Sequence, residues 1–132
     1  MKKRTLLIFI GVLLLIILIP IKTNAKKKHH ETLISMGEFK ITYYCSCGKC
    51  SNNWGTKTST GNYCKEGKTV AVDPDIIAYG TRILIDDREY VAEDCGSDVI
   101  GDHIDIYVED HETVEKFGIE YKKIWLIKKK KE

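Results

Sequence analysis

The sequence predicts a mainly β protein: a small closed barrel of six short strands with one short helix. Three observations carry this prediction. Segments rich in β-branched and aromatic residues are short, and several alternate apolar with polar side chains, which is the period of a strand. Only one stretch carries the capping residues of a helix. Six short strands favour a closed barrel, because closure removes exposed strand edges.

The strands are recognised by runs that end at turn residues. GEFKITYYCS alternates, and TVAVDP is short, β-branched and ended by Pro74. TRILIDD and REYVAED flank a tight acidic turn, which is typical of a hairpin. HIDIYVED and KKIWLIKK complete the set. The expected strands cover residues 37–46, 69–74, 81–87, 88–94, 103–110 and 122–129.

The one expected helix follows the fifth strand. Asp110 can cap its first turn, which also holds Glu112, and Gly118 can end it. Val114 and Phe117 share a face of this helix. Residues 47–68, by contrast, are rich in Gly, Ser, Asn, Thr and Lys and predict a long loop, a feature that is often functional in a small domain.

The first residues have the character of an export signal. Basic MKKR at 1–4 precedes an apolar run at 5–21, and TNA at 23–25 offers the small residues that signal peptidase prefers. The apolar run also approaches the length of a short membrane span. We therefore expect residues 1–25 to be a signal peptide, cleaved after Ala25, or an uncleaved N-terminal membrane anchor. In either case the domain lies outside the cytoplasm.

The remaining 107 residues divide by charge. We expect a polar tether at 26–36, a single domain at 37–127 and a basic tail at 128–132. The domain has ten Lys and Arg residues against seventeen Asp and Glu, a net charge near −7, whereas lysine runs fill the flanks. An acidic domain repels a phosphate backbone, so its charge argues against nucleic-acid binding.

Five cysteines follow the leader: Cys45, Cys47, Cys50, Cys64 and Cys95. Export permits disulfides, but an odd number leaves one thiol unpaired or bonded to another chain. The first four could form a zinc site, although their spacing fits the usual paired CxxC motifs poorly. Disulfides or free thiols are therefore favoured over a metal, and the pairing stays open.

Five carboxylates stand in AEDCGSDVIGDHIDIY, residues 92–107. A calcium loop of the EF-hand type is disfavoured because Val99 stands where that loop requires glycine. A solvated acidic surface and an acid–base site both remain open. The period of a strand places Ile104 and Ile106 on one face and Asp105 on the other. Carboxylates near one another and near apolar residues have raised pKa values, which is what a general acid needs.

Three segments resemble a known family. AVDPDIIAYGT (71–81), VAEDCGSDVIGDHIDIYV (91–108) and FG (117–118) are similar to the three-aspartate, or 3D, domain of exported bacterial cell-wall proteins. The resemblance covers about residues 37–127. It implies a double-psi β-barrel like the catalytic domain of the membrane-bound lytic transglycosylase A family and of muralytic stationary-phase and spore factors.

The resemblance also implies site residues. The three aspartates that name the family match Asp73, Asp94 and Asp105. KTSTG at 57–61 resembles the family's KTASG-like loop. Lys57, Thr58, Ser59 and Gly61 would therefore line the groove, and Tyr79 would also contact sugar. Some positions depart from the pattern: Ala78 replaces a proline, Cys95 a threonine, Ser97 a glycine and Asp98 a small residue.

The implied function is cleavage of peptidoglycan between N-acetylmuramic acid and N-acetylglucosamine, giving a 1,6-anhydro product. Asp105 would be the general acid and base, supported by Asp94 and Asp73, without any cofactor or metal. The alternative is a glycan-binding or wall-remodelling module that does not cut. We expect a monomer whose partners are glycan strands, secreted to the cell wall or held at the outer face of the cytoplasmic membrane by an uncleaved leader.

Overall fold

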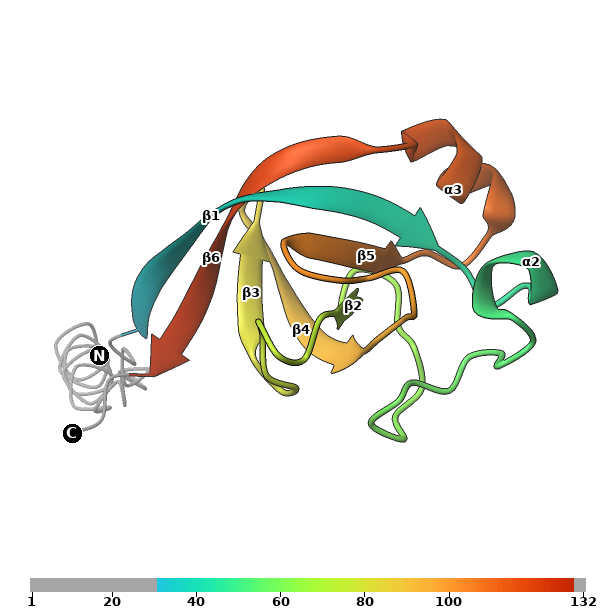
Figure 1. The fold of residues 1–132 in the computed structure, drawn as a ribbon, viewed down its shortest axis with the longest axis horizontal. Helices are drawn as coiled ribbons and strands as arrows, with labels where there is room; N and C mark the ends of the chain where they lie inside the picture. The colour runs from blue at the N-terminus through green and yellow to red at the C-terminus, as the bar shows by residue number, and fades with distance from the viewer. Residues whose placement is uncertain (1–30, 130–132) are drawn as a thin grey trace, which may run out of the picture.

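The computed structural model of the chain describes residues 31–129, and the expected leader at 1–25 lies outside the described residues. Six strands close into one barrel, as Figure 1 shows. The strands are β1 Glu31–Tyr44, β2 Thr69–Val72, β3 Arg82–Ile85, β4 Arg88–Asp94, β5 His103–Tyr107 and β6 Glu120–Lys129. The helices are α2 Gly48–Ser51 and α3 His111–Phe117.

The barrel has the strand order β1-β5-β2-β4-β3-β6 and mixes parallel with antiparallel pairs. The parallel pairs are β1 with β5 and β2 with β4, and each brings together strands that are distant in sequence. The other pairings are antiparallel. The prediction of a small, mainly β, six-stranded double-psi barrel is therefore confirmed.

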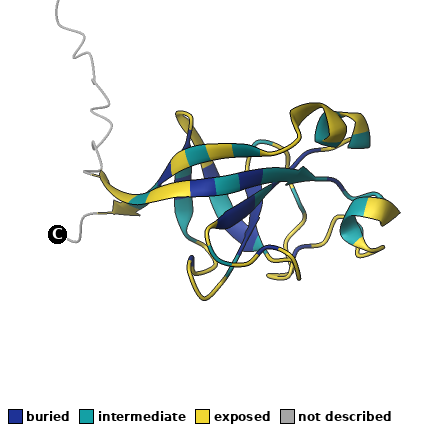
Figure 2. Ribbon diagram, turned by 45° about the horizontal axis from the view of Figure 1, so that its top comes forward, coloured by how far each residue is buried: buried dark blue, intermediate teal, exposed yellow. Residues whose placement is uncertain are grey.

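The barrel interior is filled by the apolar face that strand alternation predicts. Ile104 and Ile106 of β5 are 0% and 5% exposed and pack in one cluster with Val70 and Val72 of β2. Figure 2 shows buried residues gathered on the barrel strands, while the connecting loops are largely exposed. Because Asp105 lies between two core isoleucines, its side chain faces away from this cluster.

The helix predicted after the fifth strand is α3. The Asp110 side chain accepts a hydrogen bond from Thr113 N at 2.8 Å, and Gly118 is the C-cap. A second helix, α2, was not predicted, because it is a single turn that ends at Asn52 in the left-handed region. Of the helices in residues 31–129, neither has the length and apolar character needed to cross a membrane.

The expected tether at 26–36 is wrong over its second half. β1 begins at Glu31 and pairs with β6 from there onward, through an irregularity between Ser35 and Gly37. Two contacts explain why this stretch is ordered as strand. Glu31 forms an ion pair with Arg82 on β3, and Met36 packs against the core. Residues 26–30 and 130–132 lie outside the described residues.

Candidate active site

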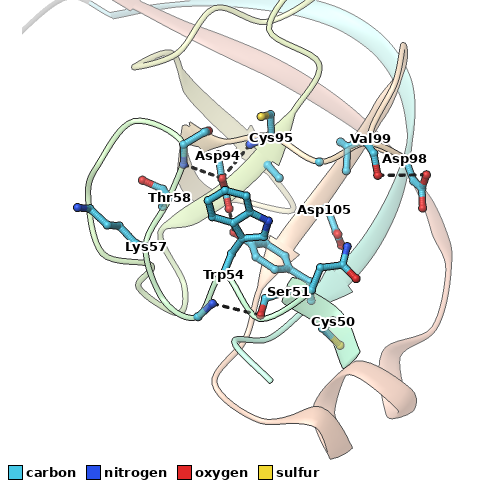
Figure 3. A pocket seen from close by; sticks show the side chains of 17 residues that line it. Cys50, Ser51, Trp54, Lys57, Thr58, Asp94, Cys95, Asp98, Val99 and Asp105 are labelled. Carbon is cyan, nitrogen blue, oxygen red and sulfur yellow. Dashed lines mark hydrogen bonds between the residues drawn. The ribbon is translucent and has the colours of Figure 1, made fainter. Parts of the chain in front are cut away.

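A pocket of about 650 Å³ lies where the loops after β1 and β4 meet the barrel (Figure 3). Its floor is formed by β2, β4 and β5, and its walls by residues 50–59 and 95–99. The lining residues are Tyr44, Cys50, Ser51, Asn52, Trp54, Gly55, Lys57, Thr58, Ser59, Ala71, Asp94, Cys95, Gly96, Ser97, Asp98, Val99 and Asp105.

Two of the three predicted aspartates share the floor of this pocket. Ala71 on β2 is the register partner of Asp94 on β4 and of Asp105 on β5. Paired residues project to the same face of a sheet, so both carboxylates flank a methyl group. The two backbones are about 10 Å apart, since neighbouring strands are about 4.8 Å apart. A small residue at 71 leaves the space between the carboxylates open.

Asp105 lies in an environment that favours its protonated form. Burial raises the pKa of the Asp105 carboxyl above its usual value, and the negative charge of Asp94 raises this pKa further. A hydrogen bond of 2.7 Å from Thr42 Oγ1 to Asp105 Oδ1 acts in the opposite direction, as do the nearby charges of His103 and Lys40. The balance is an aspartate whose pKa is raised, as a general acid requires.

A hydrogen-bonded chain connects Asp105 to the buried His103. Thr42 Oγ1 is 2.8 Å from His103 Nε2, and His103 Nδ1 is 3.0 Å from the carbonyl oxygen of Asp98. A carbonyl only accepts, so Nδ1 must carry hydrogen. Thr42 Oγ1 donates to Asp105 Oδ1 and lies within hydrogen-bond distance of His103 Nε2. One hydroxyl therefore connects the two side chains.

Asp94 is held firmly by three donors. Its Oδ1 accepts hydrogen bonds from Ser59 N at 2.9 Å and Cys95 N at 3.0 Å, and its Oδ2 accepts one from Tyr44 OH at 2.8 Å. Every one of these bonds uses the carboxylate as an acceptor. Asp94 thus fastens the loop at 57–61 and the loop after β4 to the barrel floor.

Asp73 takes a different position from the other two aspartates and does not line the pocket. Its Oδ1 accepts from Asp75 N at 3.0 Å, within the turn after β2, and its Oδ2 accepts from Gly101 N at 2.8 Å. Gly101 lies just before β5 and has a φ of +67°. Asp73 therefore ties the turn after β2 to the start of the strand that carries Asp105.

The predicted sugar-contacting residues divide into two sets. Lys57, Thr58 and Ser59 line the pocket, whereas Gly61 and Tyr79 do not. The Thr58 side chain is buried, and its hydroxyl accepts a hydrogen bond from Asn62 N at 3.1 Å, which shapes the loop. Ser59 Oγ donates to Tyr79 OH at 3.3 Å, so Tyr79 reaches the site through Ser59.

The sequence reasoning missed four residues around the aspartates: Thr42, Tyr44, Trp54 and His103. Thr42 and Tyr44 are two positions apart on β1 and therefore project from the same face of the strand, which a strand pattern can reveal. Their proximity to Asp94 and Asp105 depends on the β1–β5 pairing, which the sequence does not announce. Trp54 is 82% exposed although it lines the pocket, and Figure 3 shows its indole in front of Asp94 in that view, with Asp105 to one side.

The described cysteines are all free thiols, and three of them gather beside the pocket. Among residues 31–129, the one group arranged to hold a metal combines these three thiols with a histidine. Cys64 is not a member and instead lies 3.6 Å from Tyr44 OH. We call this group the thiol–imidazole cluster; it consists of Cys45, Cys47, Cys50 and His111.

The family, the sequence and the structures that this chain resembles are consistent with one another. The 3D domain family matches residues 68–128. The putative cell wall shaping protein YabE of Bacillus subtilis is 27% identical over 107 residues, which cover 80% of this chain and 26% of YabE. The lytic transglycosylase MltA of Escherichia coli is 27% identical with a TM-score of 0.51, over 57% of this chain and 28% of MltA. A structure of MltA with bound chitohexaose, at 22% identity and a TM-score of 0.51, shows the same fold.

These matches agree with the barrel and with the motifs that contain the aspartates. The chain spans only about a quarter of the length of YabE or of MltA. The matched family segment runs from the end of the long loop to the last strand and includes all three aspartates. Residues 68–128 therefore match the 3D domain family, and the barrel that contains them is similar in fold to that of MltA.

Proposed function

We propose that the pocket binds peptidoglycan glycan strands and cleaves the β-1,4 bond between N-acetylmuramic acid and N-acetylglucosamine as a lytic transglycosylase. The observation that carries the proposal is Asp105: a carboxyl with a raised pKa, on the floor of an open pocket, with one oxygen held by Thr42. The likeness to MltA and to a cell wall shaping protein supports the substrate class.

Asp105 acts twice in the proposed reaction. Its Oδ1 is engaged by Thr42, which leaves Oδ2 to give a proton to the glycosidic oxygen as the bond from C1 breaks. The ionised Asp105 then takes the proton of the muramic acid C6 hydroxyl, whose oxygen closes on C1 to give the 1,6-anhydro ring. The Thr42 hydroxyl, which His103 also contacts, donates a hydrogen bond to the ionised carboxylate between these two steps.

The state of Asp94 favours this mechanism over hydrolysis. A glycosidase commonly uses two carboxylates, one as acid and one as nucleophile or base. Asp94 already accepts hydrogen bonds from Tyr44 and from two backbone amides, so it is poorly placed to attack or to activate water. In a transglycosylase the nucleophile belongs to the substrate, and one free carboxyl is enough. Asp94 then raises the pKa of Asp105, and Asp73 positions the strand that carries it.

Sugar rings would be held by the pocket walls. Trp54 offers an exposed aromatic face on which the apolar side of a pyranose can stack, as aromatic side chains commonly do with flat apolar surfaces. Lys57 and Ser59 add polar groups to the lining. Bound chitohexaose in MltA is a precedent for a glycan on this fold.

Incubation of the full chain with purified peptidoglycan, followed by mass spectrometry, tests the proposal. We expect 1,6-anhydro muropeptides from the unaltered chain and a loss of about 10²- to 10⁴-fold in their rate of formation for Asp105→Asn. Asp87→Asn is the matched control: Asp87 lies in the β3–β4 turn at a φ of 62°, which asparagine also adopts. Equal activity of Asp105→Asn and the control would refute the role of Asp105.

The alternative function is glycan binding without cleavage. Glycan binding alone would use the same pocket and the same contact with Trp54, but it needs no general acid. Co-sedimentation with peptidoglycan in the absence of any anhydro product would favour this module. Asp98 is the feature that makes this alternative worth testing, because it adds an exposed negative charge to the lining.

A further inference from the structure

The thiol–imidazole cluster brings together groups that are far apart in the sequence. Its four ligand atoms all lie within 4.8 Å of one another. Nδ1 of His111 is 3.8 Å from Sγ of Cys45, 3.6 Å from Sγ of Cys47 and 3.2 Å from Sγ of Cys50. One nitrogen thus faces three sulfurs at nearly the same distance, which is convergence on a common point rather than a set of separate pairs.

These separations fit a tetrahedral metal site. Zinc binds sulfur at about 2.3 Å and imidazole nitrogen at about 2.0 Å, which at the tetrahedral angle puts the two ligand atoms about 3.6 Å apart. Three thiolates with one imidazole are a common ligand set for structural zinc. Sulfur ligands also select zinc over hard cations such as magnesium and calcium.

The local fold explains why the ligands converge. Cys45 follows the last residue of β1, and the turn of α2 brings Cys50 back toward Cys47, whose carbonyl accepts from Cys50 N at 3.2 Å. Val108 N donates to Tyr44 O at 2.9 Å and so joins the end of β1 to the segment leading into α3. The barrel and the Asp110 cap then place the first residue of α3 against the thiols.

The surroundings of the histidine are those of a metal ligand. His111 Nε2 lies 3.2 Å from Glu115 Oε1, one turn later on α3, and Nδ1 faces the sulfurs. A ligating histidine usually donates its second ring N–H to a carboxylate, which fixes the tautomer and the ring orientation. Lys49 Nζ lies 3.4 Å from His111 Nε2 and 3.8 Å from Glu115 Oε1, so its positive charge lies beside the carboxylate of this pair.

A disulfide explains the cluster less well than a metal. It would join two of the sulfurs and leave the third thiol and the imidazole without a role. Cys45 is 1% exposed and the other members are half-buried, so the four groups enclose a common centre with no open position for substrate. Closed four-ligand sites of this kind stabilise a fold and do not catalyse.

We propose that the thiol–imidazole cluster binds one zinc ion, which fastens the loop after β1 to α3 and thereby builds one wall of the pocket. Each thiol that binds releases its proton to solvent. Cys50 and Ser51 line the pocket, and Ser51 accepts hydrogen bonds from Trp54 N at 2.9 Å and from Gly55 N at 3.3 Å. The metal therefore acts on the wall that carries Trp54, independently of the aspartates.

Metal content of the full chain tests this proposal directly. The chain is produced in zinc-supplemented medium, purified in mild detergent under reducing conditions and analysed by mass spectrometry for metals. We expect about one zinc per chain, in line with one complete ligand set. Replacement of zinc by cobalt(II) should give the visible absorption of tetrahedral thiolate coordination. A reduced, zinc-exposed chain that holds no zinc and gives no such absorption would overturn the proposal.

Variants separate this ligand set from its rivals. His111→Ala should lose zinc, and Glu115→Gln, which keeps the ligands, should bind zinc about 10- to 100-fold more weakly in competition with a chelator. Cys64→Ser is the matched control, because Cys64 is a cysteine outside the cluster, and it should retain zinc fully. Loss of zinc in Cys64→Ser with retention in His111→Ala would show that Cys64, not His111, is the fourth ligand and would refute the assignment.

Discussion

Thr42 and Asp105 are register partners on the parallel strands β1 and β5, and their side chains are joined by a hydrogen bond of 2.7 Å. The strand pairing therefore fixes the distance between the hydroxyl and the carboxyl. Because this bond stabilises the ionised form, it lowers a pKa that burial raises. The protonation of Asp105 is set by residues on three different strands.

Thr42→Val should shift the pH profile of glycan cleavage. The change keeps the shape of the side chain but removes the donor, so the pKa of Asp105 rises further and the alkaline limb of the rate profile moves to higher pH. Thr42→Ser keeps the hydroxyl and should leave the limb in place. Rates of anhydro-product formation across a pH series give the measurement, and identical limbs for the two variants would contradict the role of the hydroxyl.

Asp94→Asn should shift the same limb in the opposite direction. Removal of its negative charge lowers the pKa of Asp105, so the acid form is lost at lower pH. Asp98→Asn removes an exposed charge from the same pocket and should move the limb less, because solvent screens it. Equal shifts in the two variants would mean that the pKa of Asp105 depends on the total negative charge of the pocket and not specifically on Asp94.

Asp105→Asn should stabilise the fold at neutral pH. A raised pKa means that the folded state binds this proton more tightly than the unfolded state, so stability falls as pH rises through the unfolded and then the folded pKa. The variant removes this loss, and its melting temperature should exceed that of the unaltered chain at pH 8 but not at pH 3. Calorimetry at both values checks the sign; a destabilised variant at pH 8 would contradict the burial argument.

Trp54→Ala should weaken glycan binding with little effect on stability, since the side chain is 82% exposed. Covering about 60 Å² of the indole at about 25 cal/mol per Å² contributes about 1.5 kcal/mol, or about tenfold in affinity. Titration calorimetry with chitohexaose measures the effect. Tyr121→Ala is the control, because Tyr121 is 67% exposed on β6 and does not line the pocket. An equal affinity for both variants would show that Trp54 does not contact the bound glycan.

Local patterns in the sequence were enough for much of the fold. The alternation around Asp105 separates the core isoleucines from the carboxylate, and Asp110 caps the helix as its side chain predicts. Both depend on residues within a few positions of one another. The start of β1 was missed because Glu31 is ordered by an ion pair with Arg82, which is 51 positions away.

The rest of the site depends on closure of the barrel. His103 reaches Asp105 only through Thr42, and the thiols reach His111 only once the ends of β1 and β5 are side by side. No spacing in the sequence encodes these distances. The resemblance to a family directed attention to three aspartates, but it could not show that Asp73 lies outside the pocket lining while the other two share its floor.

The pairing of Glu31 with Lys129 brings both ends of the described chain to one pole of the molecule, and Figure 1 shows α2 and its loop at the opposite pole. A structure attached to either end therefore lies away from the pocket, because the length of the domain separates the two. An attachment there orients the opening outward without obstructing it. Joined to a surface in this way, the domain would act as a short arm that presents its pocket to polymer lying beyond that surface.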